Sequence, residues 1–174
     1  MVKACAVRGA LYAGLLFLVP AVLRAQDVIG IPVGETPPPV TLENLNGDSV
    51  PLSRWIGKKP VIVEFWATWC PICAELLPRM EAAQKKFGDR AEFLVVAVAV
   101  NQSKNSVRRH LEKHPMPFTF LWDGNGAAVR AFDAPSTSYV VVLDGKGRVV
   151  YTGVGADQEI ESALETAVGG GKRR

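Results

Sequence analysis

The sequence has little of what metal clusters and disulfide frameworks require, since its 174 residues include only three cysteines and two histidines. Cys5 lies near the start, which leaves Cys70 and Cys73 as one pair with two residues between them. One pair is not a disulfide framework, and structural zinc sites usually take four cysteine or histidine ligands. His110 and His114 would share a helix face, but no second ligand pair accompanies them. We therefore expect no metal site and interpret both as surface histidines.

An excess of charge of one sign is also missing from most of the chain. The first 25 residues hold three basic residues and no acid, and the remainder balances 17 basic with 17 acidic residues. No basic stripe remains that would indicate a nucleic-acid partner. The basic end of the tail, residues 172–174, is expected to be a solvated chain end. Hydrophobic residues make up 48% of the sequence, enough for a substantial core.

Residues 1–25 are typical of a secretory signal peptide. Lys3 and Arg8 precede an apolar run over 10–22, and Ala25 suits the position before a cleavage site. The run is shorter than the roughly 20 apolar residues that span a membrane, so cleavage is favoured over an uncleaved anchor. Cys5 precedes the apolar run, which argues against lipoprotein processing there. Export would bring the remaining cysteines into an oxidising compartment.

The rest of the chain predicts one domain. Residues 26–39 are rich in proline and are interpreted as a linker, residues 40–168 as the domain and residues 169–174 as the basic tail. Asn46-Gly47 predicts an N-terminal β-hairpin between 40–45 and 49–52. The later patterns predict strands at 61–66, 91–100, 118–122, 138–143 and 148–152, and helices at 71–88, 103–114, 127–132 and 158–168, the last capped by Asp157. This order implies an α/β fold with a central mixed sheet and helices on both faces.

The chemistry is expected where the strand at 61–66 runs into the helix at 71–88. Pro71 suits the first helical position, because its missing N–H would have no partner there. Cys70 then lies at the helix N-terminus, where backbone N–H groups and the helix dipole favour a thiolate. Cys73 follows about one turn later, within reach of a disulfide. Cys70 is thus predicted to be the nucleophile, and Cys73 the thiol that resolves the mixed disulfide.

The sequence Phe-Trp-Ala-Thr-Trp-Cys-Pro-Ile-Cys over 65–73 resembles the thioredoxin fold, and more narrowly the TlpA/ResA-type exported thiol–disulfide oxidoreductases. Pro78 fits the kinking proline of that family, and Asp144-x-x-Gly147 fits its late hairpin. The resemblance covers residues 34–168. It implies a periplasmic or extracytoplasmic enzyme that reduces protein disulfides, often in cytochrome c maturation, and is itself reduced by a membrane thiol reductant. No cofactor is expected beyond the Cys70–Cys73 disulfide. Membrane attachment is expected only if the N-terminal segment is uncleaved.

The resemblance also assigns Glu64 to the position of the buried acid beneath a thioredoxin active site. Desolvation would favour its neutral form, and a proton acceptor poised near neutrality could deprotonate Cys73. The alternative is that Glu64 points to a polar edge and forms an ordinary pair. Alternation along the strand does not decide between them, since both faces of this strand are expected to be covered.

The sequence departs from the family at the proline that normally adopts a cis peptide beside the two cysteines. An ungapped alignment from Gly126 to Asp144 puts Ser138 there, after Thr137. A cis bond before a non-proline residue costs about 2.5–4 kcal/mol, so a trans bond is expected. The loop would then offer a substrate the N–H and hydroxyl of Ser138. We assign Trp69, Pro71, Thr137 and Ser138 to the substrate surface.

Two other functions are compatible with the same fold. A Cu(I) metallochaperone would use the two soft thiolates, but its relatives space the cysteines one residue wider and add a histidine. A thiol peroxidase usually lacks a second cysteine two residues away from the peroxidatic one. Thiol–disulfide exchange is therefore the preferred hypothesis.

Overall fold

The structure is a computed structural model and describes residues 29–169. The predicted signal segment 1–25, residues 26–28 of the predicted linker and residues 170–174 of the tail lie outside the described residues. Within the described range, none of the helices combines the length and the apolar character needed to cross a membrane.

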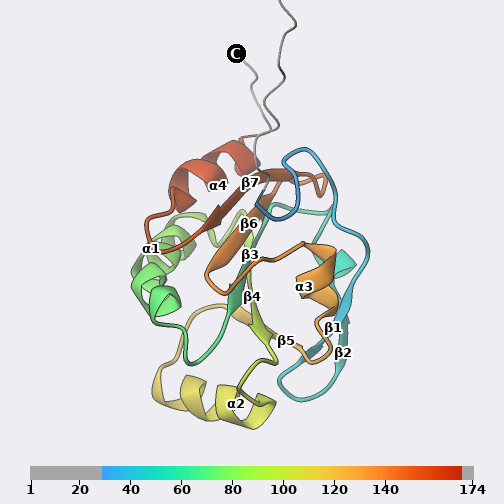
Figure 1. Cartoon of the computed structure of the whole chain (residues 1–174). Helices are drawn as coiled ribbons and strands as arrows, with labels where there is room; N and C mark the ends of the chain where they lie inside the picture. Colours follow the sequence, from blue (N-terminus) through green and yellow to red (C-terminus); the bar gives the residue numbers. More distant parts are fainter. Residues whose placement is uncertain (1–28, 170–174) are drawn as a thin grey trace, which may run out of the picture.

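A seven-stranded mixed sheet forms the centre of the fold, in the order β2-β1-β5-β4-β3-β6-β7 (Figure 1). Strands β3, β4 and β5 are parallel, while β6, β7 and the β1–β2 hairpin run antiparallel to their neighbours. The hairpin and the mixed sheet confirm the predicted fold class. The strands are β1 (Thr41–Asn44), β2 (Ser49–Pro51), β3 (Val61–Trp66), β4 (Glu92–Val98), β5 (Thr119–Asp123), β6 (Tyr139–Leu143) and β7 (Val149–Val154).

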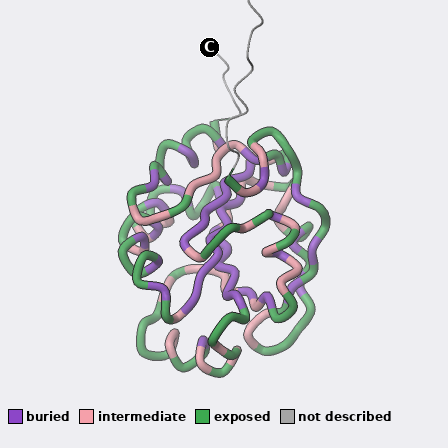
Figure 2. Tube along the Cα trace, viewed as in Figure 1, coloured by how far each residue is buried: buried purple, intermediate pink, exposed green. Residues whose placement is uncertain are grey.

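Helices cover both faces of this sheet. Helices α1 (Pro71–Phe87) and α4 (Ile160–Val168) enclose one apolar cluster with the sheet, while α2 (Lys104–Lys113), α3 (Ala127–Ala131) and a single 3₁₀ turn (Leu52–Arg54) contribute to the other. The buried part of the chain follows the central strands (Figure 2). All six residues of β3 are buried, because its two faces and both of its edges are covered.

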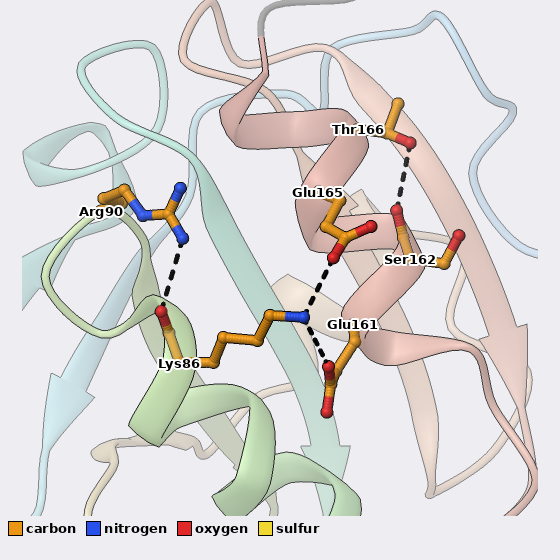
Figure 3. Close-up of polar contacts among 6 residues, drawn as sticks. All are labelled: Lys86, Arg90, Glu161, Ser162, Glu165 and Thr166. Atoms are coloured by element: carbon orange, nitrogen blue, oxygen red, sulfur yellow. Dashed lines mark hydrogen bonds and ion pairs between the residues drawn. The ribbon is translucent and has the colours of Figure 1, made fainter.

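Ion pairs connect α1 and α4 at the rim of their shared apolar face. Lys86 of α1 extends its ammonium group to the carboxylates of Glu161 (2.8 Å) and Glu165 (3.0 Å) on α4 (Figure 3). Arg90 bonds back to the carbonyl of Lys86. These side chains are about half exposed, so the ion pairs chiefly fix the alignment of two helices that apolar packing holds together.

The start of α4 differs from the prediction that Asp157 caps it. The helix begins at Ile160, and its capping residue Glu159 makes no side-chain cap bond. Asp157 lies outside the helix and forms an ion pair with Arg79 of α1 at 2.8 Å. The predicted cap is wrong because Gln158 also precedes the helix, where its side chain bonds to loop carbonyls.

The described part of the predicted linker packs on the domain. The Ile31 N–H donates to the Phe132 carbonyl (3.0 Å) and the Tyr139 hydroxyl (3.1 Å), and the Gly34 N–H donates to Val149 (2.7 Å). Gly30 has φ +77°, and a Cβ there would lie 2.0 Å from the Tyr139 hydroxyl. Only glycine fits so close to that buried ring. The packed domain therefore begins before the predicted boundary at residue 40.

Candidate active site

The β3–α1 junction places two cysteines at the first turn of a helix. Cys70 is the capping residue of α1, Pro71 is its first residue, and a disulfide joins Cys70 to Cys73 with their Cα atoms 5.3 Å apart. The Cys70 sulfur accepts a hydrogen bond from the Cys73 N–H at 3.1 Å. On reduction, that N–H and the helix dipole would stabilise a thiolate at Cys70.

The two cysteine residues differ in exposure. Cys70 retains 7% of its surface and Cys73 only 1%. Exposed apolar side chains from two loops and the first turn of α1 accompany Cys70: Trp69 at 46%, Val100 at 55% and Ile72 at 45% exposure. We call Trp69, Ile72 and Val100 the apolar rim. Exposed Pro71 lies between the cysteines. Trp69 and Pro71 are thus exposed beside Cys70, and their contact with a substrate stays a prediction.

The turn that leads into Cys70 is bound to the loop between β4 and α2. The Gln102 side-chain oxygen accepts from the Thr68 N–H (2.9 Å) and the Thr68 hydroxyl (3.0 Å). The Trp69 indole N–H donates to the Val100 carbonyl at 2.7 Å. Gln102 could not be identified from the sequence, because a lone glutamine between a strand and a polar helix carries no recognisable signal.

Glu64 lies in the sheet on the side covered by α1. It is two residues from Ile62, which packs with α1, and successive side chains along a strand alternate between faces. Glu64 is 2% exposed, and its Oε1 has no hydrogen-bond partner among the described residues. Burial raises the pKa of Glu64 to about 8. The alternative of a polar edge is wrong, while a catalytic role remains a prediction.

Ser138 directly precedes β6 and is buried rather than presented to a substrate. All peptide bonds over residues 29–169 are trans, and Ser138 adopts φ +55°. Its N–H donates to the Phe65 carbonyl at 2.8 Å, and its hydroxyl oxygen accepts from the Gly155 N–H at 3.3 Å. At 1% exposure, Ser138 faces no solvent, so the expected display of both groups to a substrate is wrong. Thr137, half-buried beside it, stays a candidate contact.

The two histidines lie on α2 or at its end, with ring centroids 5.0 Å apart. The His110 ring packs edge-on against Trp66 at 5.4 Å, and burial together with His114 lowers the pKa of His110. Within the described range, no group of three or more histidine, cysteine, aspartate or glutamate side chains is arranged to hold a metal.

A second buried acid, Asp123 at the end of β5, could not be identified from the sequence. Its carboxylate accepts a hydrogen bond from the Val129 N–H at 3.0 Å.

A thioredoxin-like sheet with a Cys-x-x-Cys disulfide at the start of a helix defines a thiol–disulfide oxidoreductase. The family model described as Redoxin matches residues 32–168, and the chain belongs to this family. Thioredoxin-like protein YneN of Bacillus subtilis is 33% identical over 148 residues, covering 81% of this chain and 84% of that protein. Thiol-disulfide oxidoreductase ResA of Halalkalibacterium halodurans is 28% identical over 136 residues, covering 76% of this chain and 75% of that protein.

Solved structures support the same assignment. A crystal structure from Chlorobium tepidum, described as a thiol:disulfide interchange protein of the DsbE type, superposes with a TM-score of 0.68 at 25% identity. The superposition covers 80% of this chain and 97% of that one. The protein is therefore a TlpA/ResA-like thiol–disulfide oxidoreductase, and the disulfide Cys70–Cys73 is the site at which such chemistry can occur.

Proposed function

We propose that the protein is an extracytoplasmic reductase of disulfides in other proteins. In the reduced enzyme, the Cys70 thiolate attacks one sulfur of the substrate disulfide, forms a mixed disulfide and releases the other sulfur as a thiolate. Cys73 then attacks Cys70, closes the enzyme disulfide and releases the second substrate thiol. Two electrons pass from the enzyme dithiol to the substrate, so no bound cofactor is required.

The asymmetry of the two cysteines is the observation that carries this proposal. Cys70 lies at the helix N-terminus beside the apolar rim, whereas Cys73 lies one turn deeper and is 1% exposed. A substrate disulfide can therefore reach Cys70 first, and Cys73 acts only within the mixed disulfide. Trp69, Pro71 and Ile72 would supply apolar contact to a polypeptide segment around the substrate disulfide, with Thr137 as a further candidate contact.

Glu64 would serve the second step of this reaction. Cys73 must lose its proton before it can attack, and a buried carboxyl whose pKa is about 8 exchanges protons near neutral pH. The Glu64 carboxylate would accept the proton of Cys73, directly or through a water molecule. The location of Glu64 on the sheet face under α1 supports this role.

The cellular setting follows from the N-terminal segment and from the resemblance to TlpA/ResA-type proteins. The signal-like residues 1–25 would direct export, either with cleavage or with retention as an anchor. A membrane thiol reductant would then restore the Cys70–Cys73 dithiol. Proteins of cytochrome c maturation are the favoured substrate class.

The reduction potential of Cys70–Cys73 tests the direction of the reaction. The chain lacking residues 1–25 would be equilibrated with thiol–disulfide buffers, and the oxidised fraction measured after thiol alkylation. We expect a value near that of thioredoxin, about −270 mV. A value near about −120 mV, as in a strong oxidant, would show that the protein introduces disulfides instead.

A trapping experiment tests the order of attack and the substrate class. The Cys73→Ser variant should accumulate a mixed disulfide through Cys70, while the matched Cys70→Ser variant should accumulate none. An oxidised Cys-x-x-Cys-His peptide, the haem-attachment pattern of c-type cytochromes, should react faster than a peptide of the same composition with the histidine moved. Equal rates would remove the cytochrome c assignment and leave general disulfide reduction.

A further inference from the structure

Gln102 uses its amide group almost fully, although it lies in a loop. Its oxygen accepts two hydrogen bonds from Thr68, and its nitrogen donates to the Val98 carbonyl at 2.6 Å. Thr68 and Gln102 are half-buried, and 34 residues separate them in the sequence. Glutamine side chains mostly lie in solvent, so these three bonds mark a built contact between the end of β4 and the turn after β3.

The neighbouring residues of both loops reinforce that contact. The Trp69 indole N–H reaches the Val100 carbonyl at 2.7 Å, two residues before Gln102. Thus both residues that directly precede Cys70 are bound to one loop, the segment 99–103 between β4 and α2. Trp69 and Val100 also belong to the apolar rim, so the same contact fixes the relative position of its two halves.

The turn has few bonds of its own. The Cys70 N–H donates to the Ala67 carbonyl at 3.1 Å, and Pro71 has no N–H to donate. In the oxidised protein the disulfide adds a covalent restraint to Cys73. Reduction removes that restraint, and the bonds from Gln102 and Val100 then restrain the approach to Cys70 from outside α1.

We propose that Gln102 is a positioning residue, which holds the turn Ala67–Cys70 so that the Cys70 sulfur stays within bonding distance of Cys73. The inference rests on thiol–disulfide exchange at Cys70 and does not depend on the direction of the reaction. A well-held turn raises the effective concentration of one thiol toward the other and so favours disulfide closure. Losing the hold weakens the disulfide and makes its reduction potential more positive.

The decisive variant is Gln102→Met, which keeps the length of the side chain and removes all three hydrogen bonds. We expect the equilibrium constant for closing the Cys70–Cys73 disulfide to fall about tenfold, which corresponds to a shift of about +30 mV. The assay is redox equilibration of the full-length protein, with mass spectrometry of the peptide that contains both cysteines. This peptide excludes any signal from Cys5. Gln84→Met, near the other end of α1, is the matched control and should leave the potential unchanged.

Two further variants separate positioning from general destabilisation. Gln102→Glu keeps both acceptor bonds to Thr68, and its negative charge disfavours the Cys70 thiolate, so its potential should not become more positive. Thr68→Val removes only the hydroxyl bond and should shift the potential in the same direction as Gln102→Met, by about half as much in millivolts (about threefold in the constant). Thr68→Val perturbs the fold least of these variants, so it can test the proposal even if Gln102→Met fails to fold.

The proposal is overturned if Gln102→Met and Thr68→Val both keep the wild-type potential, or if Gln84→Met shifts it equally. It is also overturned if Gln102→Glu becomes as positive as Gln102→Met, because the bonds to Thr68 would then be irrelevant. The absolute potential of the wild-type protein decides the proposed direction of the reaction, whereas the differences among variants decide the role of Gln102. The two conclusions can therefore fail separately.

Discussion

The buried carboxyl of Glu64 should make the folded protein less stable as the pH rises toward 8. Burial raises its pKa in the folded state from 4.5 to about 8. In the unfolded chain the same group is hydrated and ionises near its ordinary pKa. Between these two pKa values the folded protein keeps a proton that the unfolded chain has released. Stability is therefore fully present below about pH 4.5 and is lost progressively as the pH rises through this window.

The size of the effect follows from the width of the window. At pH 7 the unfolded group lies two and a half units above its pKa, and each unit is worth about 1.36 kcal/mol. Glu64 should therefore lower the free energy of unfolding by about 3 kcal/mol between pH 4 and pH 7. Solvent screening changes this energy only slightly, because Glu64 is 2% exposed. An effect of this size is a large part of the about 5–15 kcal/mol typical of a domain.

The Glu64→Gln variant isolates this contribution, because glutamine has nearly the same shape and cannot ionise. Urea unfolding of the oxidised variant and the wild-type protein would be followed at several pH values from 4 to 8. Groups common to both proteins cancel in the difference. The variant should gain about 3 kcal/mol relative to the wild type between pH 4 and pH 7. The Glu75→Gln variant on the exposed face of α1 is the matched control, because a solvated carboxylate carries no desolvation penalty.

A difference between Glu64→Gln and the wild type that stays constant from pH 4 to pH 8 would refute the reasoning. It would mean that the folded protein solvates or pairs the Glu64 carboxylate, and that the group is ionised throughout the neutral range. A proton acceptor for Cys73 with a matched pKa would then be lacking, and the proposed role of Glu64 in the second step would lose its physical basis.

Two further predictions concern packing and surface charge. Gly30→Ala should destabilise the protein by about 3 kcal/mol in thermal or urea unfolding, from the positive φ and the clash with the buried Tyr139 ring. Gly34 has φ +94°, and a Cβ added there would have nothing within 4 Å. Gly34→Ala should therefore lower the free energy of unfolding only through the backbone conformation, by about 1–2 kcal/mol. Equal losses of stability in the two variants would contradict the clash at Gly30. Lys86→Met should lower the melting temperature more than Lys85→Met at low salt, because Lys86 pairs with two carboxylates of α4, whereas the described ion pairs include none from Lys85. The difference should disappear at about 1 M salt, where charges are screened within a few ångströms; a difference that persists would assign it to packing.

The sequence predicted best what local patterns determine. The continuous apolar run of β3 has the predicted bounds, because a strand buried on both faces needs no alternation to be recognised. Pro71 fixes the start of α1 equally well, since proline is favoured at the first helical position. Together these two features place the cysteines at a helix N-terminus, so the core of the site could be predicted before the structure was known.

The predictions that failed depend on contacts between distant segments. Asp157 is of a residue type that often caps helices, but Gln158 is held outside α4 by the carbonyls of Ser138 and Gly155, so the helix begins only at Ile160. The face on which Glu64 lies was undetermined, because both faces of β3 are apolar and alternation gives no direction. Gln102 gave no signal, since the two bonds that it accepts come from Thr68, which is 34 residues away in the sequence.

Ser138 shows how tertiary bonds replace a local constraint. Without a proline at this position, the entry to β6 is held by the Ser138 N–H on the Phe65 carbonyl and by Gln158, whose amide nitrogen reaches the Ser138 carbonyl at 2.9 Å and the Gly155 carbonyl at 2.7 Å. The N–H and carbonyl of Ser138 are therefore bonded to other residues of the domain and are not free to bond to a substrate. A substrate segment that docks here must therefore contact residues before Ser138, of which Thr137 is half-buried and Ser136 exposed. Selectivity for substrates at this loop should accordingly depend on Ser136 and Thr137 rather than on Ser138.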